Sequence, residues 1–208
     1  RRIQVLEDAI EELNLRLDKL KIQAPKLNDV INHYSILFNN YLSFINIKNR
    51  NGIGISDKTY TPLIRDKEYS KITSGGLRTI ASIGYIVSMV QYSVENEINY
   101  PNLVMIDTVG KYLGKTSKNK ILSDSDLHQD DQEGLSDPLK YKNIYESIIN
   151  TAALAEEKNI ACQFILVDND VPSEFVESYK GFIVAHYDST GAEGLQVGLI
   201  DDIKVKVS

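Results

Sequence analysis

Three short segments carry residue types that could handle a nucleotide, and they occur in a definite order along the chain. The first is Ser74-Gly75-Gly76, the second is Asp107 after an apolar run, and the third is Asp168-Asn169-Asp170 after another apolar run. A serine can cap a helix, and glycines let the backbone approach a phosphate at the helix N-terminus. An aspartate at the end of a buried strand suits Mg²⁺ with its waters. Each segment alone also fits a structural role, so the interpretation depends on their order.

The spacing of apolar residues predicts the elements that position these segments. Residues 77–94 read as a buried helix, and residues 141–158 as a second helix. The run 103–106 is continuously apolar, and 162–167 is apolar apart from Gln163, as in strands covered on both faces of a parallel sheet. The ends of two such strands should open into the same crevice. The alternation predicts an α/β fold with a mostly parallel sheet flanked by helices.

The N-terminal segment shows a heptad pattern. Its apolar residues are spaced alternately three and four apart, which predicts a coiled-coil seam that needs a partner helix; they are Ile3, Leu6, Ile10, Leu13, Leu17 and Leu20. A similar spacing resumes from Leu27 to Ile45. An ordinary amphipathic helix that packs on its own core is the alternative. In residues 51–69 the apolar side chains recur at every second position, which predicts a β-hairpin. Residues 181–187 and 195–203 suggest further strands.

In this order the segments resemble the C-terminal lobe of ABC-type ATPase heads in the SMC, RecN and RecF-like superfamily. The stretch Thr73-Ser74-Gly75-Gly76-Leu77-Arg78 looks like the ABC signature. The run that ends at Asp107 looks like Walker B, and residues 109–114, with Leu113 and Gly114, stand in the place of the D-loop. Residues 164–170 look like the switch strand. The resemblance implies a coiled-coil arm and its base in residues 1–48 and the C-terminal lobe of a P-loop NTPase head in residues 49–208.

The resemblance implies a function as well as a fold. Two heads would sandwich ATP and Mg²⁺, with Ser74, Gly75, Gly76 and Arg78 acting across the dimer and Asp107 holding the metal in its own chain. The implied partners are a second head, in a homodimer, and an N-terminal lobe of the same protein. Heads of this superfamily are similar to ATPases of DNA repair, chromosome maintenance and phage defence, so DNA is a further partner that the resemblance implies.

Two positions depart from the family pattern and bear on hydrolysis. Thr108 stands where a glutamate usually activates the attacking water, and a neutral hydroxyl is a poor base. Asn169 stands where the switch histidine belongs, and it cannot take up a proton. Hydrolysis would then depend on Asp168 or Asp170. Three hypotheses follow: a hydrolysing head, a non-hydrolysing head that uses ATP as a latch, and a coiled-coil interaction module without a nucleotide site.

Other motifs give weaker signals. The stretch 110–116 ends in Gly-Lys-Thr but has one residue too few between its glycines for a phosphate loop, and no helical pattern follows it. The acidic stretch 124–131 lacks the central glycine of a calcium loop. The three histidines, His33, His128 and His186, show no metal-ligand spacing.

Composition narrows the class of protein. The chain has 208 residues, a net charge of -6 and a sequence pI near 5.1, which disfavour a dedicated basic nucleic-acid surface. Its single cysteine, Cys162, lies in an apolar run and cannot form an internal disulfide. No apolar stretch is long enough to span a bilayer. We therefore expect a cytoplasmic protein without a membrane partner. The sequence starts at Arg1 in the middle of the heptad pattern, which suggests a piece of a longer polypeptide.

Overall fold

The computed structural model describes residues 2–23, 26–107, 109, 138–168, 171, 173–188 and 196–197, and the structural statements below concern these residues. The chain divides into two units, Arg1–Asp168 and Asn169–Ser208, which are described separately.

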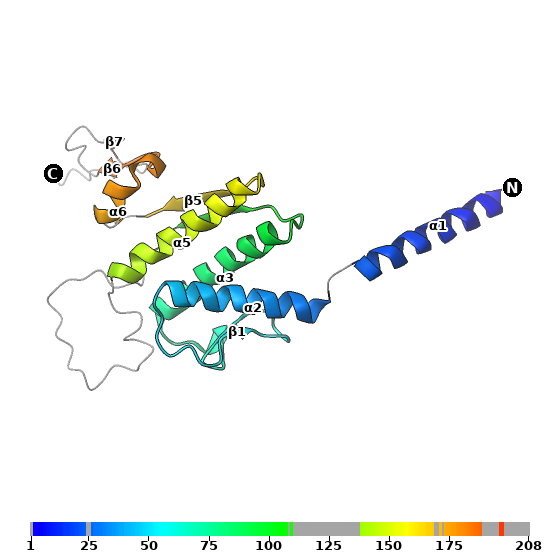
Figure 1. Ribbon diagram of the computed structural model, residues 1–208, viewed down its shortest axis with the longest axis horizontal. Helices are drawn as coiled ribbons and strands as arrows, with labels where there is room; N and C mark the ends of the chain where they lie inside the picture. Colours follow the sequence, from blue (N-terminus) through cyan, green and yellow to red (C-terminus); the bar gives the residue numbers. More distant parts are fainter. Residues whose placement is uncertain are drawn as a thin grey trace, which may run out of the picture. The chain divides into compact units, whose positions relative to one another are not determined.

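Three helices of the first unit, α2 (Leu27–Phe44), α3 (Gly75–Glu95) and α5 (Pro138–Glu157), lie side by side (Figure 1). The main core lies where α2 packs on α3. Its most deeply buried side chains are apolar and come from both helices and from the segments that flank them; they include Phe38, Leu42, Ile45, Leu77, Ile80 and Val90. The spacing of three and four in the sequence places these residues on one face of each helix, so the predicted helices 27–45 and 77–94 are confirmed.

Close contact between α2 and α3 depends on Gly84. A Cβ atom at this position would overlap the aromatic ring of Tyr41 and would lie 3.2 Å from the Phe38 ring. The Tyr41 hydroxyl is buried and has no hydrogen-bond partner among the described residues. The two helices therefore approach closely at Gly84, which has no side chain, and the tyrosine ring fills the space that this leaves.

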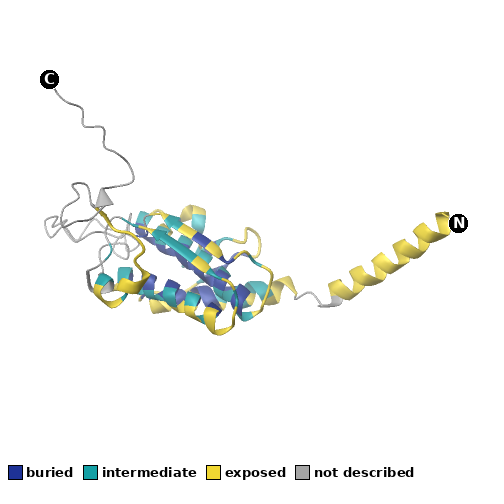
Figure 2. Cartoon of the chain, turned by 90° about the horizontal axis from the view of Figure 1, so that it is seen from above, coloured by how far each residue is buried: buried dark blue, intermediate teal, exposed yellow. Residues whose placement is uncertain are grey.

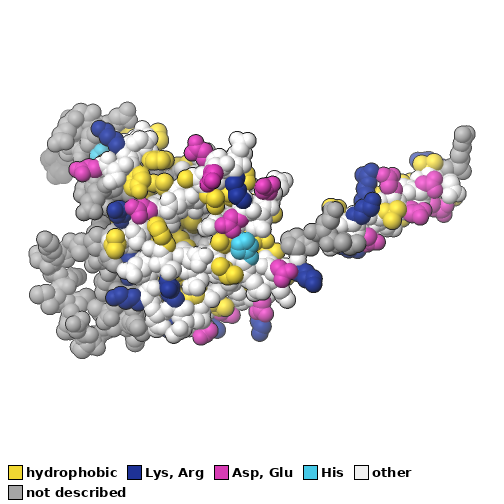
Figure 3. Space-filling model, in the orientation of Figure 1, with side chains coloured by type: hydrophobic (Ala, Val, Ile, Leu, Met, Phe, Trp, Pro, Cys, Tyr) yellow, Lys and Arg dark blue, Asp and Glu magenta, His cyan; other side chains and the backbone are white. Residues whose placement is uncertain are grey.

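Helix α1 (Arg2–Gln23) differs from α2 in its surroundings. All six residues of the heptad seam are exposed, from 49% for Leu17 to 73% for Ile3. In Figure 2 the residues of α1 whose burial is described all have the colour of exposed residues, and in Figure 3 the helix carries side chains of both charges beside apolar ones. The predicted helix is confirmed, whereas the predicted coiled coil stays a prediction.

A small antiparallel sheet follows α2. It is formed by β1 (Gly54–Ile55), β2 (Pro62–Ile64) and β3 (Lys67–Glu68), and the 3₁₀ helix η1 (Tyr69–Lys71) leads on towards α3. Arg65 and Asp66 form the tight turn between β2 and β3, both with positive φ. The predicted hairpin is therefore confirmed, and a third strand extends it.

The second sheet consists of β4 (Leu103–Asp107) and β5 (Gln163–Val167), which pair in parallel and in register. One face covers a cluster of buried residues that includes Val90, Val94 and Val104. The other face exposes Leu103 at 55% and Met105 at 70%. The prediction that both faces of these strands are covered is therefore wrong for the described residues, because helices pack on one side of the sheet alone.

The second unit contains short elements. They are α6 (Ser173–Ser178), the 3₁₀ helix η2 (Lys180–Phe182), and the parallel pair β6 (Tyr187–Asp188) and β7 (Gln196–Val197). The strand predicted at 181–187 is wrong, because η2 and an irregular segment occupy all but its last residue. Most of the strand predicted at 195–203 lies outside the described residues.

The fold is thus mixed α/β with a small parallel sheet, as the sequence predicted at this level, although the helices pack on one face of that sheet. Among the described helices, none combines the length and apolar character needed to cross a membrane.

Candidate functional site

Ser74 caps helix α3. Its backbone is extended, with φ -69° and ψ 122°, and the hydroxyl oxygen accepts a hydrogen bond of 3.3 Å from the Leu77 N–H. The residue is 3% exposed. Since a hydroxyl accepts and donates, capping leaves its hydrogen available for a second contact. The predicted helix start is confirmed at Gly75.

The other residues of the predicted signature surround this cap. Gly75 is half-buried and Gly76 is buried in the first turn of α3, where N–H groups lack partners within the helix. Arg78 is exposed, and its Nη2 donates to the Ser70 carbonyl oxygen at 3.1 Å. Its guanidinium lies over the Tyr69 ring, 6.0 Å from the ring centre. Arg78 therefore ties the start of α3 to η1 while keeping an exposed positive charge beside the cap.

The two predicted strand tips meet at one edge of the β4–β5 sheet. Asp107 pairs with Val167 in the parallel register, and Asp168 follows directly. The topology thus brings Asp107 and Asp168 to the same end of the sheet, as predicted.

The two carboxylates nevertheless lie on opposite faces of the sheet. Asp107 shares the alternation of the exposed residues Leu103 and Met105. Asp168 lies towards α5, where its Oδ2 accepts hydrogen bonds from the hydroxyl of Tyr141 and, at 2.8 Å, from that of Tyr145. A single crevice that contains both carboxylates, as the sequence suggested, is therefore not what the structure shows.

The tyrosine pair that binds Asp168 comes from the first half of α5. The two rings meet edge to face, with centres 5.3 Å apart. Burial raises the pKa of the Tyr145 hydroxyl above its usual range, and the hydrogen bonds to Tyr141 and Asp168 act in the same direction. Tyr145 therefore remains a neutral donor to the carboxylate. The spacing i, i+4 on a predicted helix, facing a strand that ends in aspartate, is the sequence signal that could have found this cluster.

The cap of α3 is far from Asp107 within one chain. Val90 and Val94, near the end of α3, pack against Val104, and the chain reverses direction before β4. From these valines, α3 extends back over about 27 Å towards Ser74. Strand β4 advances in the same direction by only about 10 Å before it ends at Asp107. Ser74 therefore lies on the order of 15 Å beyond Asp107. One phosphate group cannot contact both residues of the same chain.

The described residues offer no complete metal centre of their own, since no cluster of three or more histidine, cysteine, aspartate or glutamate side chains occurs among them. Mg²⁺ commonly uses one or two carboxylates together with waters and substrate phosphates. Asp107 is exposed at its strand end. The donor set therefore fits an ion that arrives with a nucleotide, and does not fit an ion held by the protein alone.

Several predicted site residues lie outside the described residues. These are Thr108, Asn169 and Asp170, the D-loop positions Leu113 and Gly114, and the stretches 110–116 and 124–131. Two of the histidines are described: His33 Nε2 lies 3.1 Å from a Glu95 carboxylate oxygen, and His186 is exposed. Cys162 is half-buried, and burial raises the pKa of its thiol.

Comparison with models of known protein families finds no match for this chain, and comparison with the sequences of characterised proteins finds none either.

Proposed function

We propose that the chain is the C-terminal lobe of an SMC-like ATPase head, which dimerises with a second head around ATP and Mg²⁺. The observation that carries the proposal is the arrangement around α3 and β4. A capped Ser-Gly-Gly helix start and a strand that ends in an exposed aspartate belong to one packed unit, yet they are too far apart to share a phosphate. This separation suits a head dimer, in which the helix start and the aspartate of one chain would contact two different nucleotides.

The exposed face of the β4–β5 sheet supports a second lobe. Parallel sheets usually have both faces covered, because their apolar side chains would otherwise face water. Leu103, Met105 and Val167 are 55%, 70% and 53% exposed. An N-terminal lobe that carries the phosphate loop would cover them and would supply the part of the nucleotide site that this chain lacks.

The roles follow from position. Ser74, Gly75 and Gly76 would donate to the γ-phosphate of the nucleotide on the partner head, and Arg78 would add positive charge beside them. Asp107 would hold Mg²⁺ through waters or directly, as the chemistry of this ion prefers. Thr108, Asn169, Leu113 and Gly114 keep the roles that the resemblance implies, as part of the same proposal.

Dimerisation tests the proposal. The full-length protein is expected to dimerise with ATP and Mg²⁺ in analytical ultracentrifugation, and Ser74→Arg is expected to remove this dimer by placing a bulky cation where the phosphate would lie. Ser70→Arg is the matched control, because it adds the same side chain four residues earlier, in η1. A dimer that does not depend on ATP, or that Ser74→Arg leaves unchanged, would refute the proposal.

A second candidate is a head that binds ATP as a latch without turnover, and one observation favours it. The carboxylate of Asp168 is engaged by Tyr141 and Tyr145 on the face of the sheet opposite Asp107. It is therefore not directed at a water beside a metal at Asp107. Steady-state phosphate release separates the two functions: if Asp168 is the general base, Asp168→Asn should lower the rate by about 10²-fold or more. In a latch, release is at background in both proteins while ATP-dependent dimerisation persists.

The third hypothesis, an interaction module without a nucleotide site, is tested by equilibrium binding of a non-hydrolysable ATP analogue. Saturable binding by the full-length protein at millimolar Mg²⁺ would exclude it. Asp107→Asn should then weaken the Mg²⁺-dependent part of the binding.

A further inference from the structure

The carboxylate of Asp168 is held by two tyrosine hydroxyls on the face of the β4–β5 sheet that α5 contacts. Its Oδ2 accepts one hydrogen bond from Tyr141, in the first turn of α5, and another of 2.8 Å from Tyr145, one turn later. Tyr145 is 4% exposed, and Asp168 is half-buried. Because the two rings also pack edge to face, both donors have a fixed origin on one helix.

These hydrogen bonds make the α5 side of the sheet a favourable position for the carboxylate. Hydrogen bonds to an ionised acceptor are shorter and stronger than those between neutral groups. A half-buried carboxylate that lost both donors would bear the cost of desolvation without compensation. Removal of the two hydroxyls should therefore release the Asp168 side chain towards water, while the rings that pack beside it stay in place.

A released Asp168 would find Asp107 nearby. Asp107 pairs with Val167 in the parallel register, and Asp168 follows Val167 directly. Neighbouring strands lie about 4.8 Å apart and a strand advances about 3.3 Å per residue, so the two aspartate Cα atoms lie on the order of 6 Å apart. The β4–β5 pairing ends one residue before Asp168. A local turn at the strand end can thus bring the two carboxylates together without breaking the sheet.

We infer that Tyr141 and Tyr145 are positioning residues that keep the Asp168 carboxylate away from Asp107 and thereby restrain ATP hydrolysis. The inference rests on the proposed function, in which Asp107 holds Mg²⁺. After release, Asp168 accepts a proton from the attacking water. The water oxygen forms a bond to the γ-phosphorus, and the bond from this phosphorus to the bridging oxygen breaks with its electron pair going to ADP. The two tyrosines and Asp168 are called the tyrosine lock below.

Binding of Mn²⁺ to the nucleotide-free, full-length protein, measured by electron paramagnetic resonance, tests the tyrosine lock without turnover. Mn²⁺ prefers the same carboxylate and water ligands as Mg²⁺. The variant Tyr141→Phe/Tyr145→Phe removes both hydroxyls and preserves both rings. It should bind Mn²⁺ at least about fivefold more tightly than the wild type, because two carboxylates can then reach the ion. The gain should disappear when Asp168→Asn is added.

Phosphate release at saturating ATP and Mg²⁺ provides a second measurement. The double variant should release phosphate at least about tenfold faster than the wild type, and only while Asp168 is present. The matched control is Tyr34→Phe/Tyr85→Phe. It removes two tyrosine hydroxyls of the same unit, which donate to the carbonyl oxygens of Tyr85 and Tyr60. The control should change neither Mn²⁺ affinity nor phosphate release.

The inference is overturned if Mn²⁺ affinity or phosphate release of the double variant stays at the wild-type level, or if either gain survives Asp168→Asn. A purely structural cluster would lower the thermal unfolding midpoint without raising either quantity. The single variant Tyr141→Phe leaves the buried Tyr145 intact and should show smaller gains in both, which keeps the test decisive if the double variant unfolds. Failure of the proposed head would appear separately, as wild-type protein that does not dimerise with ATP, because the Mn²⁺ measurement needs no nucleotide.

Discussion

Helices α1 and α2 share one apolar spacing and have opposite surroundings. Both place apolar residues three and four apart, yet Phe38 and Leu42 of α2 are fully buried while Leu13 and Leu20 of α1 are each 63% exposed. The spacing determines which residues share a helix face. Whether that face is covered depends on another segment: α3 covers α2, and no described residue covers the seam of α1.

The comparison is tested most strongly by shortening one leucine in each helix. Leu42→Ala should lower the free energy of unfolding by about 3 kcal/mol, because it removes a fully buried side chain and leaves a cavity. Leu13→Ala should change it by less than about 0.5 kcal/mol in dilute solution. Urea titrations of both variants measure the difference. Equal losses would mean that the seam of α1 is already packed against a partner helix.

The contact between α2 and α3 should fail if Gly84 gains a side chain. Gly84→Ala should cost about 2 kcal/mol, since overlap with the Tyr41 ring outweighs the gain in helix propensity of about 1 kcal/mol. Gly181→Ala is the matched control, because a Cβ atom there meets nothing within 4 Å. Thermal melts of the two variants provide the measurement, and a stabilised Gly84→Ala protein would contradict the packing described above.

High pH should destabilise the packing of α2 and leave α1 unaffected. Burial raises the pKa of Tyr34 and Tyr41 in α2, while α1 has no tyrosine. Because the folded pKa lies above the unfolded value near 10, the stability from each neutral hydroxyl is complete below about pH 10. Above it, each tyrosine should cost about 1.4 kcal/mol per pH unit.

The variant Tyr41→Phe isolates the contribution of one of these two tyrosines to the pH dependence of stability. In urea titrations above about pH 10, this variant should lose stability less steeply by about 1.4 kcal/mol per pH unit. Tyr60→Phe is the control, because Tyr60 is 48% exposed. Parallel curves for the wild type and Tyr41→Phe would show that Tyr41 titrates normally.

The smallest effect concerns the start of α3, which covers α2. Ser74→Ala removes the side chain that caps the helix and should cost about 1 kcal/mol. Ser74→Asp, which preserves an accepting oxygen, should recover most of the loss. Chemical denaturation of both variants tests this, and no loss in Ser74→Ala would mean that the hydrogen bond to Leu77 contributes nothing.

Much of the fold followed from apolar spacing, because helices 27–45 and 77–94 and both parallel strands bury one regular face. The sequence could not show that β4 exposes Leu103 and Met105, since a continuous apolar run does not say how many faces are covered. In the second unit, short apolar stretches were too irregular to separate the strand expected at 181–187 from the 3₁₀ helix at Lys180–Phe182.

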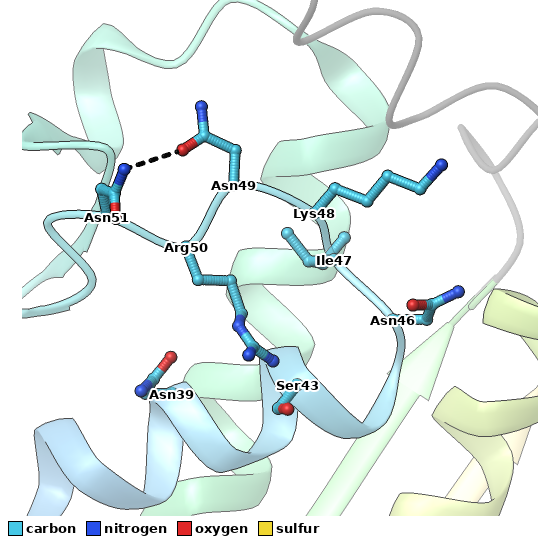
Figure 4. A pocket seen from close by; sticks show the side chains of 8 residues that line it. All are labelled: Asn39, Ser43, Asn46, Ile47, Lys48, Asn49, Arg50 and Asn51. Carbon is cyan, nitrogen blue, oxygen red and sulfur yellow. Dashed lines mark hydrogen bonds between the residues drawn. The ribbon is translucent and has the colours of Figure 1, made fainter.

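The candidate site was predictable in outline and not in detail. The order of segments placed Asp107 and Asp168 at one sheet edge, because parallel strands share their carboxyl ends. The faces on which the two side chains lie depend on the strand register and on Tyr141 and Tyr145 of α5, which hold Asp168. The conformation of the loop that carries Arg50 (Figure 4) could not be foreseen, because the side chain of Arg65 holds it from the turn between β2 and β3, later in the chain.

The bend at Asn51 and Gly52 has a consequence for the protein over time. Both residues are exposed, and the Asn51 amide donates to Asn49 Oδ1 at 3.2 Å. In an Asn-Gly sequence the backbone nitrogen of the glycine can attack the asparagine side chain without hindrance, which releases ammonia and leaves a carboxylate after hydrolysis. Stored protein should therefore drift slowly towards a more acidic species in ion exchange. The new charge would arise directly beside Arg50, so the age of a preparation becomes a variable in any measurement on the protein.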